Sequence, residues 1–199
     1  MLRKNSCVFK SMFLAVVLAM AFGATSLPAA VCQGVTVTIN GTSGNDVLYG
    51  TSAIDVIQAG GGNDLVYGRG NNDIICGSGG NDDVRGEDGH DSIYMGTGDD
   101  DVDGGNGADY IVGGDGSDYL DGNGGNDEIR GSNQNDVLFG GDHNDELMGE
   151  NGDDCLFGEL GTNYLTGGTG WDLCSLGASA GCECTTTACI LANLNDCSF

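Results

Sequence analysis

Residues 104–121 read Gly-Gly-Asn-Gly-Ala-Asp-Tyr-Ile-Val-Gly-Gly-Asp-Gly-Ser-Asp-Tyr-Leu-Asp, which is one nine-residue pattern written twice. The pattern G-G-x-G-x-D-x-U-x, with U a large aliphatic residue, runs in phase fifteen times from Gly41 to Ser175 without insertion or deletion. A fixed short period is typical of solenoids, in which each repeat buries its apolar face against its neighbours. The repeats therefore decide the fold class.

Each repeat divides into a Gly-rich turn and a short strand. Gly reaches left-handed backbone conformations at no steric cost, so the first half of the repeat favours a turn. In the strand, the apolar eighth residue points to one face and its neighbours to the other. Alternate repeats carry mainly Val and Leu, or mainly Ile, at this position. We therefore expect an all-β parallel β-roll (β-solenoid) with two nonapeptides per coil and about seven coils.

The sixth position carries Asp in fourteen of the fifteen repeats. A hard cation takes six to eight oxygen ligands, and a Gly-rich turn offers one carboxylate together with main-chain carbonyls. Turns that stack on the same side, 18 residues apart, would share an ion. The predicted Ca²⁺ ligands are Asp46, Asp64, Asp73, Asp82, Asp91, Asp100, Asp109, Asp118, Asp127, Asp136, Asp145, Asp154 and Asp172. Asp55 and Asn163 are the weaker positions, because their repeats depart from the pattern.

The charge of the chain agrees with a cation load. Three of the six basic residues lie before residue 31 and all thirty acidic residues lie after it, so residues 31–199 carry a net charge of −27. Fifteen stacked repeats permit up to about 13 intercalated Ca²⁺ ions, whose charge nearly balances the protein. Nucleic acids and anionic membrane surfaces attract clustered Lys and Arg, so we expect neither nucleic-acid binding nor membrane insertion.

The repeat run resembles the RTX, or haemolysin-type, calcium-binding repeats of bacterial secreted proteins. The resemblance implies a right-handed parallel β-roll with calcium between successive turns, bound by the Asp of each G-G-x-G-x-D and by nearby carbonyls. It covers about two-thirds of the chain. Many family members carry a catalytic or pore-forming region before the repeats, whereas about ten residues separate the expected signal peptide from Gly41 here. Members also commonly lack cysteines and use a C-terminal export signal, whereas this chain has a signal-peptide pattern at its N-terminal end and a cysteine-rich tail.

The two ends of the chain read differently from the repeats. Residues 1–30 have basic residues, an apolar run and small residues, which predicts a signal peptide cleaved within about 24–30. A retained anchor and lipidation at Cys32 are the minor alternatives. We expect an N-terminal capping strand at residues 31–40 and a Cys-rich, disulfide-rich C-terminal cap at residues 176–199.

Cys7 lies in the predicted signal peptide, which leaves eight cysteines, an even number that favours disulfides in a secreted chain. The Cys182-Glu183-Cys184 run is the alternative hint of zinc, but it has no second paired motif or nearby His. Cys32 with Cys76 is a candidate pair that would tie down the N-terminal strand. Six cysteines gather toward the C-terminal end: Cys155, Cys174, Cys182, Cys184, Cys189 and Cys197.

These observations favour a secreted, extracellular or cell-surface calcium-binding protein without enzymatic activity, with a structural, adhesive or matrix role. An ice-binding solenoid and an accessory module of a secreted toxin or enzyme system are the alternatives. The third position of the repeats varies and forms no Thr ladder, and no catalytic constellation is evident. A protein or cell-surface partner, or the terminal segments, would cover an outward apolar stripe formed by Val47, Tyr49, Leu65, Tyr67, Val137, Phe139, Phe157 and Leu173.

Overall fold

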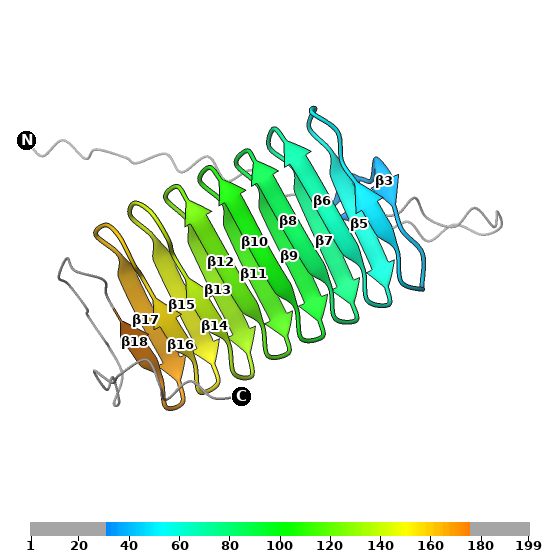
Figure 1. The fold of residues 1–199 in the computed structure, drawn as a ribbon. Coiled ribbons are helices and arrows are strands. Elements are labelled where there is room, and N and C mark those ends of the chain that lie inside the picture. The colour runs from blue at the N-terminus through cyan, green and yellow to red at the C-terminus, as the bar shows by residue number, and fades with distance from the viewer. Residues whose placement is uncertain (1–30, 176–199) are drawn as a thin grey trace, which may run out of the picture.

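The computed structural model describes residues 31–175, which form eighteen β-strands and no helix (Figure 1). The strands are β1 (Val31–Cys32), β2 (Val35–Thr36), β3 (Ile39–Asn40), β4 (Val47–Tyr49), β5 (Val56–Gly61), β6 (Leu65–Gly70), β7 (Ile74–Gly79), β8 (Asp83–Asp88), β9 (Ser92–Thr97), β10 (Asp101–Asn106), β11 (Tyr110–Asp115), β12 (Tyr119–Gly124), β13 (Glu128–Asn133), β14 (Val137–Phe139), β15 (Glu146–Asn151), β16 (Cys155–Phe157), β17 (Tyr164–Thr169) and β18 (Leu173–Ser175). Within this part of the chain, no helix could span a membrane.

Two parallel sheets of eight strands each make up a β-solenoid of about eight turns (Figure 1). From β3 onward, consecutive strands alternate between the sheets, so that even-numbered strands form one sheet and odd-numbered strands the other. Parallel partners lie 18 residues apart, as Val102 and Leu120 do in β10 and β12. The 18-residue offset is the spacing that the Val/Leu and Ile series indicate.

The core lies between the two sheets and consists of the eighth residues of the repeats. Ile111 and Leu120, from β11 and β12, are completely buried, and the whole series from Ile57 to Leu165 is inaccessible to solvent. Ala59 and Met95 join this core although each stands at the first position of its repeat, where Gly is usual. Aliphatic side chains in contact along both ladders account for the apolar cohesion of the solenoid.

The N-terminal end contains strands that precede the repeats. β1 and β2 form a small antiparallel sheet, whereas β3 pairs in parallel with β5 and completes the eighth strand of its sheet. The fifteen repeats supply eight strands to the even-numbered sheet and seven to the other, so β3 makes the two sheets equal, and the solenoid has about eight turns against the seven coils expected. The candidate pair Cys32–Cys76 is confirmed as a disulfide with Cα atoms 5.9 Å apart, and it ties β1 to β7.

The outward apolar stripe is exposed at one end only. Val47 and Tyr49 are 56% and 53% exposed, while Val137, Phe157 and Leu173 near the other end are buried. Tyr49 stacks on the ring of Tyr67 with centroids 5.1 Å apart. The exposed apolar surface of this stripe is therefore concentrated on β4.

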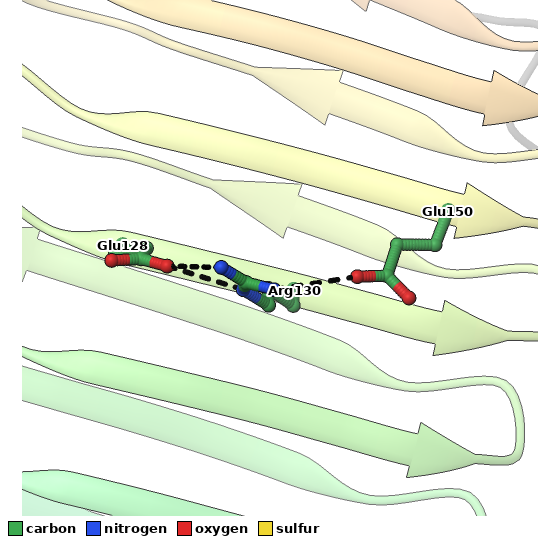
Figure 2. A network of polar contacts seen from close by, with 3 residues as sticks. All are labelled: Glu128, Arg130 and Glu150. Atoms are coloured by element: carbon green, nitrogen blue, oxygen red, sulfur yellow. Dashed lines mark hydrogen bonds and ion pairs between the residues drawn. The ribbon is translucent and has the colours of Figure 1, made fainter. Parts of the chain in front are cut away.

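Charged pairs on the outer face contribute little to the stability of the sheets. Figure 2 shows Arg130 of β13 between Glu128 and Glu150, with nitrogen–oxygen distances of 2.6 and 3.8 Å. All three side chains are more than a third exposed, and surface ion pairs of this kind are worth about 0–1 kcal/mol. The interactions that decide whether the coil forms must lie in the core and in the turns.

The predicted signal peptide at residues 1–30 and the predicted cap at residues 176–199 lie outside the described residues. Cys155 is disulfide-bonded, as the disulfide interpretation of the C-terminal cysteines expects for it. Cys174 occupies the eighth position of the last repeat and is buried in the core.

Candidate metal site

The sixth residue of each repeat is buried in the turn, although it is charged in all but one case. Thirteen of the fourteen sixth-position Asp residues are between 0 and 6% exposed, and Asn163 is 6% exposed. The remaining one, Asp46 at the N-terminal end, is half-buried. Burial of a carboxylate is costly unless hydrogen bonds or a cation compensate for the lost water. The hydrogen-bond partners of the two carboxylate oxygens therefore show which oxygen still lacks a compensating interaction.

One carboxylate oxygen links neighbouring turns. The backbone N–H of Asp109 donates to Oδ1 of Asp127, 18 residues further on, with a nitrogen–oxygen distance of 2.8 Å. The same bond joins thirteen pairs of sixth-position residues, from Asp46 with Asp64 to Asp154 with Asp172, at 2.7–3.2 Å. Both sides of the solenoid are thus lined by a ladder of carboxylates, each tied to the turn before it.

The other carboxylate oxygen is left over in most turns. Within residues 31–175, the Oδ2 atoms of eleven sixth-position Asp residues are buried without a hydrogen-bond partner. They belong to Asp64, Asp73, Asp82, Asp91, Asp100, Asp109, Asp118, Asp127, Asp136, Asp145 and Asp154. A buried, unpaired anionic oxygen that recurs with the period of the coil matches a cation ligand, since a cation would supply the missing interaction.

A second ladder runs beside the first in the opposite direction. At the fifth position, Oδ1 of Asn63 accepts from the backbone N–H of Asn81, which lies 18 residues after it. Ten such bonds occur, and His90 takes part through Nδ1, which accepts from the N–H of Ala108 at 2.6 Å. Side chains thus satisfy the amide groups of two adjacent residues in the turn, which holds successive turns in a fixed register.

Burial raises the pKa of the carboxyl groups in the turns. The pKa of Asp100 and that of Asp127 rise to about 7, and that of Asp136 rises to about 8. Desolvation is the main cause in each, opposed by the backbone hydrogen bond to Oδ1 and reinforced by neighbouring carboxylates. A metal-free row of this kind holds protons near neutral pH, and a cation would compete with those protons.

Main-chain atoms complete the surroundings of the carboxylates. No three His, Cys, Asp or Glu side chains of residues 31–175 converge to hold a metal by themselves, so a bound ion would require carbonyl oxygens as well. The turns bring backbones very close together: a Cβ added at Gly107 would overlap the carbonyl oxygen of Gly89 in the turn before. Carboxylate and carbonyl oxygens in a flexible turn fit Ca²⁺, which accepts six to eight such ligands, better than Mg²⁺, which prefers a rigid octahedron and retains water.

Comparison with known proteins agrees with this geometry. The family model of the RTX calcium-binding nonapeptide repeat (4 copies) matches seven overlapping segments, which together cover residues 40–180. The chain belongs to this family. Its RTX repeats imply calcium binding, and the buried Asp rows are consistent with that role. No curated protein matches the chain.

The turns of this RTX solenoid are not all alike. Asp46 and Asp55, the sixth residues of the first two repeats, have their Oδ2 atoms hydrogen-bonded to Thr42 and Thr51, while Asn163 donates from its amide nitrogen to the carbonyl of Gly158. The repeat pattern predicts weak binding at Asp55 and Asn163 and an ordinary ligand at Asp46. It does not predict the Thr contacts, for which the Gly-Thr-Ser start shared by these two repeats is the only sequence signal.

Proposed function

We propose that this chain is a secreted protein that folds as a calcium-bound β-roll outside the cell and has a structural, adhesive or matrix role without catalysis. The observation that carries calcium binding is the row of eleven buried Oδ2 atoms that have no hydrogen-bond partner in residues 31–175. Secretion is supported by the signal-peptide pattern of residues 1–30. A purely structural role is supported by the large share of the chain that consists of repeats.

Calcium would stabilise the coil by joining turns. From Asp64 onward, each sixth-position carboxylate already contacts the preceding turn through Oδ1, so an ion at Oδ2 would add cross-links between turns that the apolar core does not supply. An ion that binds only the folded state stabilises that state in proportion to the logarithm of its concentration over its dissociation constant. We therefore propose that calcium concentration controls folding, with up to about 13 ions from the stacking of fifteen repeats.

Calcium titration with two readouts tests the proposal. Far-ultraviolet circular dichroism of the full chain should show strand content rising with Ca²⁺ and not with equal Mg²⁺, and native mass spectrometry should show several bound ions. Equal strand content in chelator and in calcium would overturn calcium-dependent folding. A mass unchanged by calcium would overturn calcium binding itself.

The exposed residues Val47 and Tyr49 on β4 are the proposed contact for a protein or cell-surface partner. The ice-binding alternative is less well supported, because Thr occurs at only two positions, Thr97 and Thr169, of a stacked third-position row. The row runs Gly61, Gly79, Thr97, Asp115, Asn133, Asn151 and Thr169. A thermal hysteresis assay distinguishes this alternative from a structural role.

A further inference from the structure

The backbone of the first two turns differs from that of the other thirteen. In repeats three to fifteen, the second and fourth residues have positive φ angles, such as 101° at Gly105 and 134° at Gly107. This holds even for side-chain-bearing residues, including Arg69 at 83° and Glu150 at 73°. In repeats one and two, none of the corresponding residues has a positive φ. The corresponding residues are Thr42, Gly44, Thr51 and Ala53.

The second residue explains this difference. Thr stands at the second position only in the first two repeats. A β-branched residue disfavours positive φ strongly, because its branched Cβ crowds the backbone. Thr42 and Thr51 therefore prevent the left-handed conformation that Gly, Ser, Asn, Glu and Arg adopt at the same position elsewhere. These two turns therefore adopt a different backbone conformation.

In that conformation, hydrogen bonds from Thr satisfy the carboxylate without an ion. The backbone N–H and Oγ1 of Thr42 donate to Oδ2 of Asp46 over 2.6 and 2.8 Å. The same groups of Thr51 donate to Oδ2 of Asp55 over 2.7 and 2.9 Å. Oγ1 of each Thr also accepts from the N–H two residues later, at 3.2 and 3.1 Å. Asp55 is as buried as its counterparts in later turns, and yet its Oδ2 has two donors.

Other interactions hold this end of the solenoid together. The Cys32–Cys76 disulfide joins β1 to β7, and Thr38 pairs with Val56 through its side chain, with Oγ1 accepting from the N–H of Val56 at 2.9 Å and donating to its carbonyl at 3.1 Å. Cys32 is 1% exposed, so the small β1–β2 sheet packs closely on the solenoid. Covalent and side-chain contacts act at the end where the turns have no free carboxylate oxygen.

We propose that Thr42 and Thr51 exclude calcium from the first two turns, so that residues 41–58 form a calcium-free end of the solenoid and the ions bind between later turns. The inference rests on the proposed calcium binding and adds which turns take part in it. In repeats whose sixth residue is Asp, the second residue then determines whether the carboxylate is open to an ion. In turns with Thr, the Thr donates to the carboxylate of its own turn, whereas eleven of the thirteen later turns present a buried oxygen without a hydrogen-bond partner.

Restoring Gly at the second position tests the inference by gain of an ion. Thr42→Gly gives the first repeat the consensus start Gly-Gly-Ser-Gly-Asn-Asp, and its Asp46 then faces Asp64 in the third repeat. Native mass spectrometry of the full chain at saturating Ca²⁺ should show one more ion than in the wild type. The double variant Thr51→Gly/Ala53→Gly should do the same for the second repeat, which provides an independent test if one variant folds poorly.

Two matched variants separate the backbone effect from the loss of a side chain. Ser43→Gly, in the same exposed turn, should leave the ion count unchanged. Thr42→Val keeps the β-branched Cβ and removes the hydroxyl, so it should also leave the ion count unchanged. Equal counts in the wild type and both Gly variants would overturn the inference, as would a gain in Ser43→Gly or Thr42→Val. A wild-type chain that binds no calcium would instead overturn the proposed function.

Discussion

The backbone N–H of Asp100 donates a 2.9 Å hydrogen bond to Oδ1 of Asp118 in the next turn on the same side of the solenoid. Oδ2 of Asp118 is buried and has no hydrogen-bond partner within the described residues 31–175. One side chain thus joins two turns through one oxygen and offers the other oxygen to a cation. This division of roles leads to the predictions for the turns.

Asp100→Asn should remove calcium without removing the hydrogen bond to the preceding turn. An amide oxygen can still accept from the N–H of Asp82, but the amide nitrogen cannot bind a cation. We expect at least one ion fewer by native mass spectrometry and a higher calcium concentration at the folding midpoint. Asp99→Asn makes the same charge change at the exposed neighbouring residue and should have little effect. Equal ion counts for the two variants would contradict the assignment of Asp100 as a ligand.

The raised pKa values predict opposite effects of pH with and without calcium. The pKa of Asp100 rises from 3.8 to about 7 and that of Asp136 from 3.8 to about 8 on folding, chiefly through burial. Between pH 4 and 8, the metal-free folded state therefore binds more protons than the unfolded state, and its stability falls as pH rises. Strand content of the calcium-depleted chain should be greater at pH 5 than at pH 8.

With calcium the trend reverses, because the ion binds the deprotonated carboxylates and competes with protons. The apparent calcium affinity should fall as pH is lowered from 8 to 5. Calcium titrations at both pH values, followed by circular dichroism and started from the depleted chain, measure both trends. A depleted chain that is more structured at pH 8 would show that the buried carboxylates do not control its stability.

Ile111→Ala should destabilise the calcium-saturated solenoid by about 2–5 kcal/mol, because it opens a cavity in a completely buried core position. Val112→Ala, at the next residue on the outward and partly exposed side, should cost less than about 1 kcal/mol. Urea denaturation of both variants at saturating calcium measures the difference in the free energy of unfolding. Similar losses would mean that the inner face of β11 is not the main source of apolar stabilisation.

Asn163→Asp should add a calcium ligand to the fourteenth repeat. The Asn163 amide nitrogen donates to the carbonyl of Gly158, which a carboxylate could not do, and the freed oxygen would resemble Oδ2 in neighbouring turns. The ion count should rise by one. Asn144→Asp adds the same charge at a fifth-position residue of the facing turn, whose Oδ1 accepts from Thr162, and should leave the count unchanged. A rise in both variants would indicate a nonspecific charge effect.

Replacing both disulfide cysteines, Cys32→Ser with Cys76→Ser, should lower the free energy of unfolding by about 2–4 kcal/mol, because the bond closes a loop between residues separated by 44 positions. Urea denaturation in calcium measures the loss. Unchanged stability would show that the N-terminal sheet is held without the covalent link.

The periodic sequence predicts most of the solenoid, because every repeat places the same residue types at its core and turn positions. The eighth-position residues, such as Ile93 and Leu138, lie in the core as expected, and the sixth-position Asp residues lie buried in the turns. A strict register makes one correct assignment valid for the others. The strand pairing could therefore be inferred without long-range information.

The structure differs from the predictions in a strand outside the repeats and in turns where a side chain changes the backbone conformation. β3 precedes the repeats, so the repeat pattern could not reveal that Ile39 pairs with Ile57. The first two turns keep the consensus Asp, but Thr42 and Thr51 change the backbone around it. The pattern reports which residue types recur, whereas the partner of each Oδ2 atom depends on the φ angle four residues earlier.

The constant offset of 18 residues between paired strands makes the length of the solenoid adjustable in equal steps. Insertion or deletion of 18 residues between Ile75 and Leu147 would change the distance between the two ends by one strand spacing, about 4.8 Å, and would leave both ends chemically intact. A gene that gains or loses such a segment would encode a spacer of different reach with the same termini. The length of the solenoid can thus vary by whole coils while the chemistry of its two ends stays the same.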